Sequence, residues 1–103
     1  MYLLVDLSGP VARVSLDDAG NMREFSVVVV GGGVPDGRVA GALAGLGTID
    51  GEHAWLDGAA VKRLAGAGVG ESWPAEFDRM TEFARSKGWT DAHGRLRAHL
   101  KSR

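Results

Sequence analysis

The residues with the clearest chemical potential form a glycine cluster between a run of valines and a short helical segment. Gly31, Gly32 and Gly33 follow the valines and precede Gly37. A strand, a glycine turn and a helix N-terminus together present backbone N–H groups that bind phosphate. The spacing G-x-G-x-x-x-G differs from the dinucleotide-binding G-x-G-x-x-G, and Arg38 follows where a P-loop has lysine. The cluster is therefore a candidate ligand-binding loop, with the alternative that it is only a flexible exit from a buried strand.

Histidines are the next candidates, and the chain contains His53, His93 and His99. Neither an H-E-x-x-H motif nor a cysteine accompanies them, so the spacing predicts no metal site. If His53 and His99 lie on neighbouring strands, they form a pair able to transfer a proton or respond to pH. We take these two histidines and Arg97 as candidate ligand-binding residues. The alternative is a partly buried His53 with the other two histidines on the surface.

The C-terminal segment is basic. In an extended chain its alternate residues share one face, namely Arg95, Arg97, His99, Lys101 and Arg103. Such a stripe can contact phosphates or an acidic partner, whereas the simpler interpretation is a charged outer face that protects an edge strand from aggregation. Because no aromatic residues alternate with the basic ones, the pattern argues against binding of single-stranded nucleic acid, and nucleic acid is not a favoured partner.

Support for a catalytic nucleophile is missing from the sequence. There is no cysteine and no G-x-S-x-G elbow, and the carboxylates are scattered. The pattern favours a non-enzymatic protein, so we assign no catalytic residue and no cofactor.

Strands are predicted for the first third of the chain. Residues 2–7 and 11–16 alternate between apolar and polar side chains, which is typical of strands with one buried face. Residues 25–30 are rich in aromatic and β-branched residues, and their four consecutive valines indicate a strand buried on both faces. Turn residues separate the three segments, so we expect an antiparallel meander with the third strand central.

Helices are predicted for the middle of the chain, over residues 36–46, 57–66 and 72–87. Asp36 and Asp57 are expected to cap the first two, and glycines end all three. The third has the clearest period, and Trp89 stands where a Schellman motif places an apolar residue that packs on the last turn. Its buried face is expected to contain Trp73, Phe77, Met80 and Ala84.

Two further segments favour strands. Residues 52–56 alternate weakly, and residues 95–101 fit a strand or a helix interrupted by Gly94. The strand is favoured because Asp91 and Gly94 occupy the first and fourth positions of a type I turn. The predicted fold class is α+β: a three-stranded N-terminal antiparallel meander extended by one or two short strands, with about three helices packed on one side.

Composition bounds the remaining possibilities. The 103 residues are 45% hydrophobic and 24% charged, with a net charge of −1 and no cysteine, values that predict a single α+β domain over residues 1–103. Disulfides and cysteine-bound metals are excluded. The N-terminus lacks the pattern of a signal peptide or membrane span, so a cytoplasmic location is expected. Arginine outnumbers lysine nine to three, and alanine, glycine and valine are abundant, which suggests a GC-rich bacterial genome.

The tryptophans bear on partners. Trp55, Trp73 and Trp89 are three of only seven aromatic residues, and packing in the core is their expected role. Tryptophan is also rarely fully buried and is enriched at the centres of interfaces, so one or two of them are candidates for a partner surface. The leading hypothesis is a non-enzymatic interaction or assembly module, either a homodimer or an accessory subunit. The alternative is a ligand-binding or catalytic domain with a pocket between sheet and helices, and a less favoured third is nucleic-acid binding through the basic C-terminus. None of these hypotheses involves a membrane.

Overall fold

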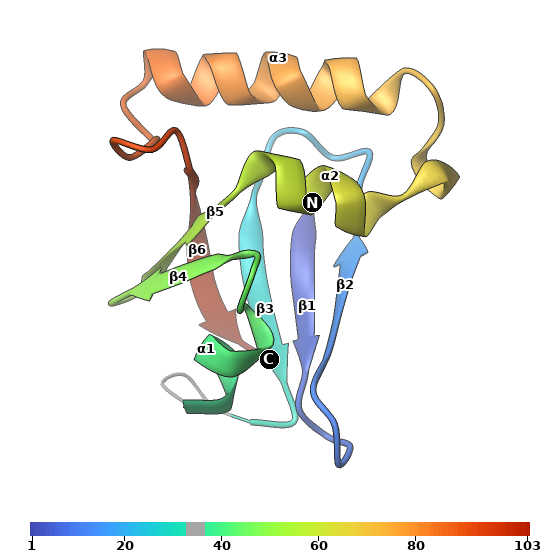
Figure 1. The fold of residues 1–103 in the computed structure, drawn as a ribbon, viewed down its shortest axis with the longest axis vertical. Helices are drawn as coiled ribbons and strands as arrows, with labels where there is room; N and C mark the ends of the chain where they lie inside the picture. Colours follow the sequence, from blue (N-terminus) through green and yellow to red (C-terminus); the bar gives the residue numbers. More distant parts are fainter. Residues whose placement is uncertain (33–36) are drawn as a thin grey trace.

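The structure is a computed structural model that describes residues 1–32 and 37–103. Within these residues it forms a six-stranded sheet and three α-helices (Figure 1). The elements in chain order are β1 (Tyr2–Asp6), β2 (Arg13–Asp17), β3 (Ser26–Val30), α1 (Gly37–Ala42), β4 (Gly47–Asp50), β5 (His53–Leu56), α2 (Gly58–Ala65), the 3-10 turn η1 (Ala67–Val69), α3 (Trp73–Ser86) and β6 (Leu96–Ser102).

The sheet is mixed, with the strand order β2-β1-β3-β6-β5-β4. The α+β class and the internal position of β3 are confirmed, but the antiparallel meander is wrong. β1 pairs antiparallel with β2 and parallel with β3, and β6 also runs parallel to β3. β3 runs parallel to β1 because residues 18–25 cross from β2, on one side of β1, to the other side, passing the N-terminal start of β1. There the Met1 amino group donates hydrogen bonds to the carbonyl oxygens of Asn21 and Glu24, at 2.9 and 3.1 Å.

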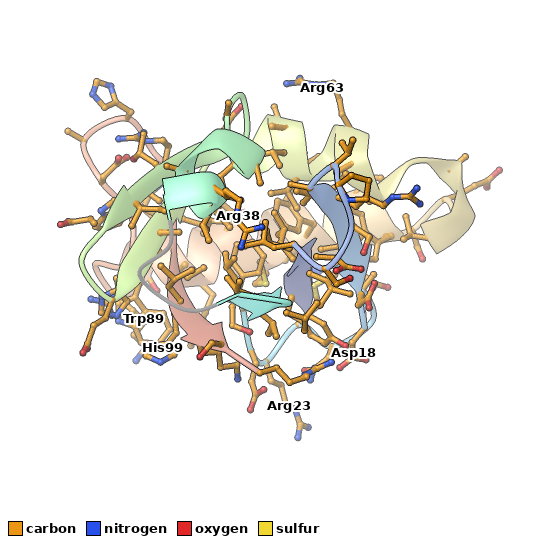
Figure 2. The ribbon with its side chains drawn as sticks, turned by 90° about the horizontal axis from the view of Figure 1, so that it is seen from below. Asp18, Arg23, Arg38, Arg63, Trp89 and His99 are labelled. Atoms are coloured by element: carbon orange, nitrogen blue, oxygen red, sulfur yellow. The ribbon has the colours of Figure 1, made fainter. Side chains whose placement is uncertain are left out.

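One face of the sheet packs against α1 and α2, and we call the opposite side the open face. In Figure 2, Arg63 of α2 lies on one side of the sheet and His99 of β6 on the other. Alternation along the strands separates the two faces, as period-2 side-chain geometry requires. The packed face carries the fully buried residues Leu3, Val5, Val27, Val29, Ala54 and Leu56, together with Leu96, Ala98 and Leu100.

The helix α3 crosses the end of the sheet at which β1, β3 and β6 begin (Figure 1). Trp73, Phe77 and Ala84 are buried, as the helical period predicts. The predicted Schellman ending is confirmed. Gly88 has a φ of +77°, and the Trp89 and Gly88 N–H groups donate to the carbonyls of Ala84 and Arg85. Trp89 therefore folds back beside the last turn of the helix.

The predicted C-terminal strand is also confirmed. The Gly94 N–H donates to the Asp91 carbonyl at 3.0 Å, which closes the expected turn before β6. β6 then lies between β3 and β5, with Leu96, Ala98 and Leu100 inward.

Two details differ from the sequence-based expectations. α1 ends at Ala42, shorter than the predicted 36–46, because Gly41 and Gly45 weaken the helix. The expected cap, Asp36, lies outside the described residues. β4 was not predicted at all, since it is only four residues long and its side chains are mostly exposed.

Candidate functional site

His53 and His99 face each other across neighbouring strands. They are direct partners in the antiparallel β5–β6 pair, and their ring centroids lie 5.8 Å apart at an interplanar angle of 74°. Both point to the open face, because their neighbours Ala54 and Ala98 point into the core. The pairing considered from the sequence is therefore present.

A pocket lies where the two histidines meet α3 and the loop before β3. Its volume is about 540 Å³, within the range of roughly 300–1,000 Å³ that is usual for small-molecule sites. We call it the α3 pocket. Its apolar side is formed by Met22, Phe25, Met80, Phe83, Trp89 and Leu96, and its polar side by Arg23, Glu24, His53, Arg97 and His99.

The cationic and imidazole groups of the α3 pocket have no polar partner within the part of the chain that the structure describes. The side chains of Arg23, His53, Arg97 and His99 make no hydrogen bond or ion pair there. Arg97 is held by its backbone, whose N–H donates to the Trp89 carbonyl at 3.0 Å. The pocket therefore offers several hydrogen-bond donors that are free to contact a ligand.

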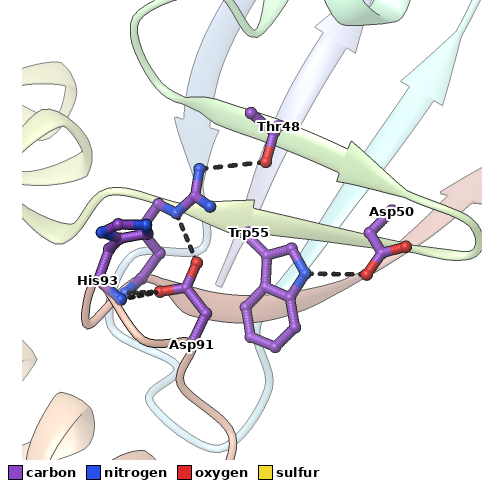
Figure 3. A network of polar contacts seen from close by, with 6 residues as sticks. Thr48, Asp50, Trp55, Asp91 and His93 are labelled. Carbon is purple, nitrogen blue, oxygen red and sulfur yellow. Dashed lines mark hydrogen bonds and ion pairs between the residues drawn. The ribbon is translucent and has the colours of Figure 1, made fainter.

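A polar network connects residues 91–95, the turn before β6, to the β4–β5 hairpin (Figure 3). The Asp91 carboxylate accepts hydrogen bonds from the backbone N–H groups of His93 and Arg95 and from the Arg95 guanidinium, the last at 2.6 Å. The guanidinium also donates to the Thr48 hydroxyl at 3.1 Å, and these bonds fix the chain that leads directly into Arg97. Within the hairpin, the Trp55 indole donates separately to Asp50.

The network predicts a pH dependence. Desolvation raises the pKa of Asp91, but the hydrogen bonds from Arg95 and His93 outweigh it and hold that pKa below its ordinary value of 3.8. A lowered carboxylate pKa contributes stability that is present above the ordinary value and is lost as the pH falls through the lowered one. We expect the amide NMR signals of His93 and Arg95 to shift together only when the pH falls below the ordinary carboxylate value of 3.8. Asp91→Asn is expected to abolish this shift, and an unchanged shift in that variant would contradict the assignment.

The glycine cluster does not join the α3 pocket. Gly31 and Gly32 follow the opposite end of β3, and a strand of five residues places Gly31 roughly 16 Å from Ser26. Gly31 has a φ of +75°, and a Cβ there would lie 2.4 Å from the Ser8 backbone nitrogen. Its contact is thus with the chain that follows β1. Gly33 lies outside the described residues.

The three tryptophans have different surroundings. Trp73 is 3% exposed, as expected for the buried face of α3, and donates from its indole to the Ala19 carbonyl at 2.7 Å, so it is not available as the interface residue also considered. Trp55 is half-buried on the open face. Trp89 is 42% exposed at the rim of the α3 pocket, so it is the tryptophan with the most surface available.

The basic residues of the C-terminal segment differ in whether their side chains are already in contact with other residues. Arg95 is paired with Asp91, and the Arg103 guanidinium lies 5.5 Å from the centroid of the Tyr2 ring. Arg97, His99 and Lys101 remain exposed on the open face. A continuous basic surface along β6 is therefore interrupted at both ends.

Sequence reasoning missed the apolar side of the pocket. Phe83 lies off the buried stripe of α3, and it is 56% exposed and packs edge-on against Trp89 at 6.0 Å between centroids. A phenylalanine on the polar face of an amphipathic helix was the available signal. Met22 and Phe25 precede β3 and carried no such signal, because only the tertiary fold brings their loop beneath α3.

Comparisons with protein-family models, curated proteins and solved structures find no match to this chain. Among the described residues, no helix combines the length and the apolar character needed to cross a membrane. In the same residues, no three histidine, aspartate or glutamate side chains are grouped closely enough to hold a metal ion.

Proposed function

We propose that this protein is a small-molecule-binding domain and that the α3 pocket is its binding site. The observation that carries the proposal is the meeting of an apolar, aromatic wall with unpaired polar side chains of β5 and β6. Ligand sites typically combine a mostly apolar lining with a few polar groups that fix orientation. His53, Arg97 and His99, selected from the sequence, lie together in this pocket.

The wall is suited to an organic ligand. Met22 and Met80 have flexible thioether side chains that adapt to different shapes. Phe25 is held in place by an edge-on contact with the buried Phe77 ring, at 6.4 Å between centroids. The pocket thus joins one fixed aromatic side chain to adaptable neighbours.

The test uses a neutral apolar fluorescent probe, N-phenyl-1-naphthylamine, titrated into the folded protein. We expect saturable binding at one site, with affinity reduced about two- to tenfold by Phe83→Ala, because an aromatic contact contributes about 0.5–1.5 kcal/mol. Val11→Ala is the matched control, since Val11 is 70% exposed but does not line the pocket. Absence of saturable binding, or equal losses in both variants, would contradict the proposal.

A second candidate function is self-association, the leading hypothesis from the sequence. The observation that favours it is the exposed pair Phe83 and Trp89, because exposed aromatic side chains often anchor interfaces. Light scattering on the same variants separates the two candidates. A stable dimer that dissociates in Phe83→Ala would support association, whereas a monomer that binds the probe would support the ligand-binding function.

A further inference from the structure

We infer, on the basis of the proposed function, that the α3 pocket takes an amphipathic carboxylate, meaning an organic acid with an aromatic or aliphatic body. The lining is divided between two sides. Among the described residues, three of the four free donor side chains lie on the sheet side, on β5 and β6, with Arg23 as the fourth on the loop before β3. The aromatic and methionine side chains come mainly from α3 and the same loop. A ligand that satisfies both sides has one polar end and one apolar end.

Arg97 is the group best suited to the polar end. It stands between the buried Leu96 and Ala98 on β6, so its side chain points to the open face. Its guanidinium has no acceptor among residues 1–32 and 37–103. A guanidinium presents parallel N–H donors that match the two oxygens of a carboxylate.

The two histidines extend this donor site. His99 is two residues from Arg97 on the same face of β6, which places their Cα atoms roughly 7 Å apart. His53 lies directly opposite His99 on β5. A neutral imidazole has one N–H donor, so each histidine can add one hydrogen bond to an anionic oxygen without carrying a charge.

The surroundings favour a single negative charge over a phosphate. The part of α3 that lines the pocket, Met80 to Ala84, lies in its C-terminal half, where the helix dipole gives an anion no attraction and opposes a doubly charged ligand more than a singly charged one. Phosphate sites commonly use a helix N-terminus, and none lines this pocket among the described residues. Glu24 and Arg23 both line the pocket from the loop before β3, so the negative charge of Glu24 opposes a second negative charge on the ligand and offsets the positive charge of Arg23.

The experiment compares three probes that share one ring system: 1-naphthaleneacetate, 1-naphthaleneacetamide and 1-naphthyl phosphate, each titrated by calorimetry. We expect the acetate to bind at least about tenfold more tightly than the amide, because a charge-assisted bidentate pair is stronger than neutral hydrogen bonds. The phosphate is expected to bind more weakly than the acetate.

Variants locate the effect. Arg97→Gln is expected to weaken acetate binding much more than amide binding, and so to remove most of the acetate's advantage over the amide. Lys101→Gln is the matched control, because Lys101 lies on the same strand face but outside the α3 pocket. Glu24→Gln is expected to strengthen acetate binding by about two- to threefold, because it removes a like charge.

The outcomes separate this inference from the proposed function. Equal binding of acetate and amide, or equal effects of Arg97→Gln on both, would overturn the carboxylate while leaving the pocket as a ligand site. Tighter binding of the phosphate would replace the carboxylate by a phosphorylated ligand. If all three probes and N-phenyl-1-naphthylamine fail to bind the folded protein, the proposed function itself fails.

Discussion

Phe77→Ala is expected to lower the free energy of unfolding by about 3–5 kcal/mol. The Phe77 side chain is 1% exposed and stacks on Trp73, with 5.1 Å between ring centroids. It also contacts the edge of Phe25, which lines the α3 pocket. Small domains have only about 5–15 kcal/mol of stability in total, so this loss is a large fraction.

The measurement is urea denaturation followed by tryptophan fluorescence. Phe83→Ala is the matched control, because it makes the same chemical change on the same helix at a side chain that is 56% exposed. Its cost is expected to stay below about 1 kcal/mol. Similar losses in the two variants would mean that α3 is not packed on the sheet as described.

Gly31→Ala is expected to destabilise the protein by about 3 kcal/mol, through two separate effects. The φ of +75° is unfavourable for alanine, and the new Cβ would lie 2.4 Å from the Ser8 nitrogen and 2.7 Å from the Ser8 Cα. Backbone atoms at that distance must move, and overpacking of this kind costs about 1–3 kcal/mol.

A second glycine isolates the conformational effect. Gly45 has a φ of +80°, but a Cβ there would meet no atom within 4 Å. Gly45→Ala is therefore expected to cost only about 1 kcal/mol, measured by the same denaturation. Equal costs at the two positions would show that the close approach to Ser8 contributes nothing. A larger cost at Gly31 would mean that this glycine is needed for close packing against Ser8, so that its presence requires no phosphate-binding role.

Local signals predicted the elements that depend on local geometry. Alternation in β1, the valine run of β3 and the glycine after α3 each reflect the conformation of a few adjacent residues. The parallel pairing of β1 with β3 was not predictable in this way. Alternation tells which side chains share a face, but it does not tell which strand lies alongside.

The candidate site was predictable only in part, for the same reason. His53, Arg97 and His99 were selected because their side chains can donate hydrogen bonds or transfer protons, and the fold brings them together. The two histidines meet because β6, the last strand, inserts beside β5. The apolar wall escaped prediction because Met22 and Phe25 reach the pocket only when the loop before β3 passes beneath α3.

The position of β6 has a consequence for the order of events during synthesis. β6 lies between β3 and β5, so it joins the group β2-β1-β3 to the hairpin β4-β5. Translation delivers these seven residues after the other five strands. Until then β3, with four consecutive valines, has one unpaired edge, and unpaired apolar edges are prone to aggregate. A nascent chain of this protein therefore carries an exposed, apolar strand edge until β6 has been synthesised and can pair with it.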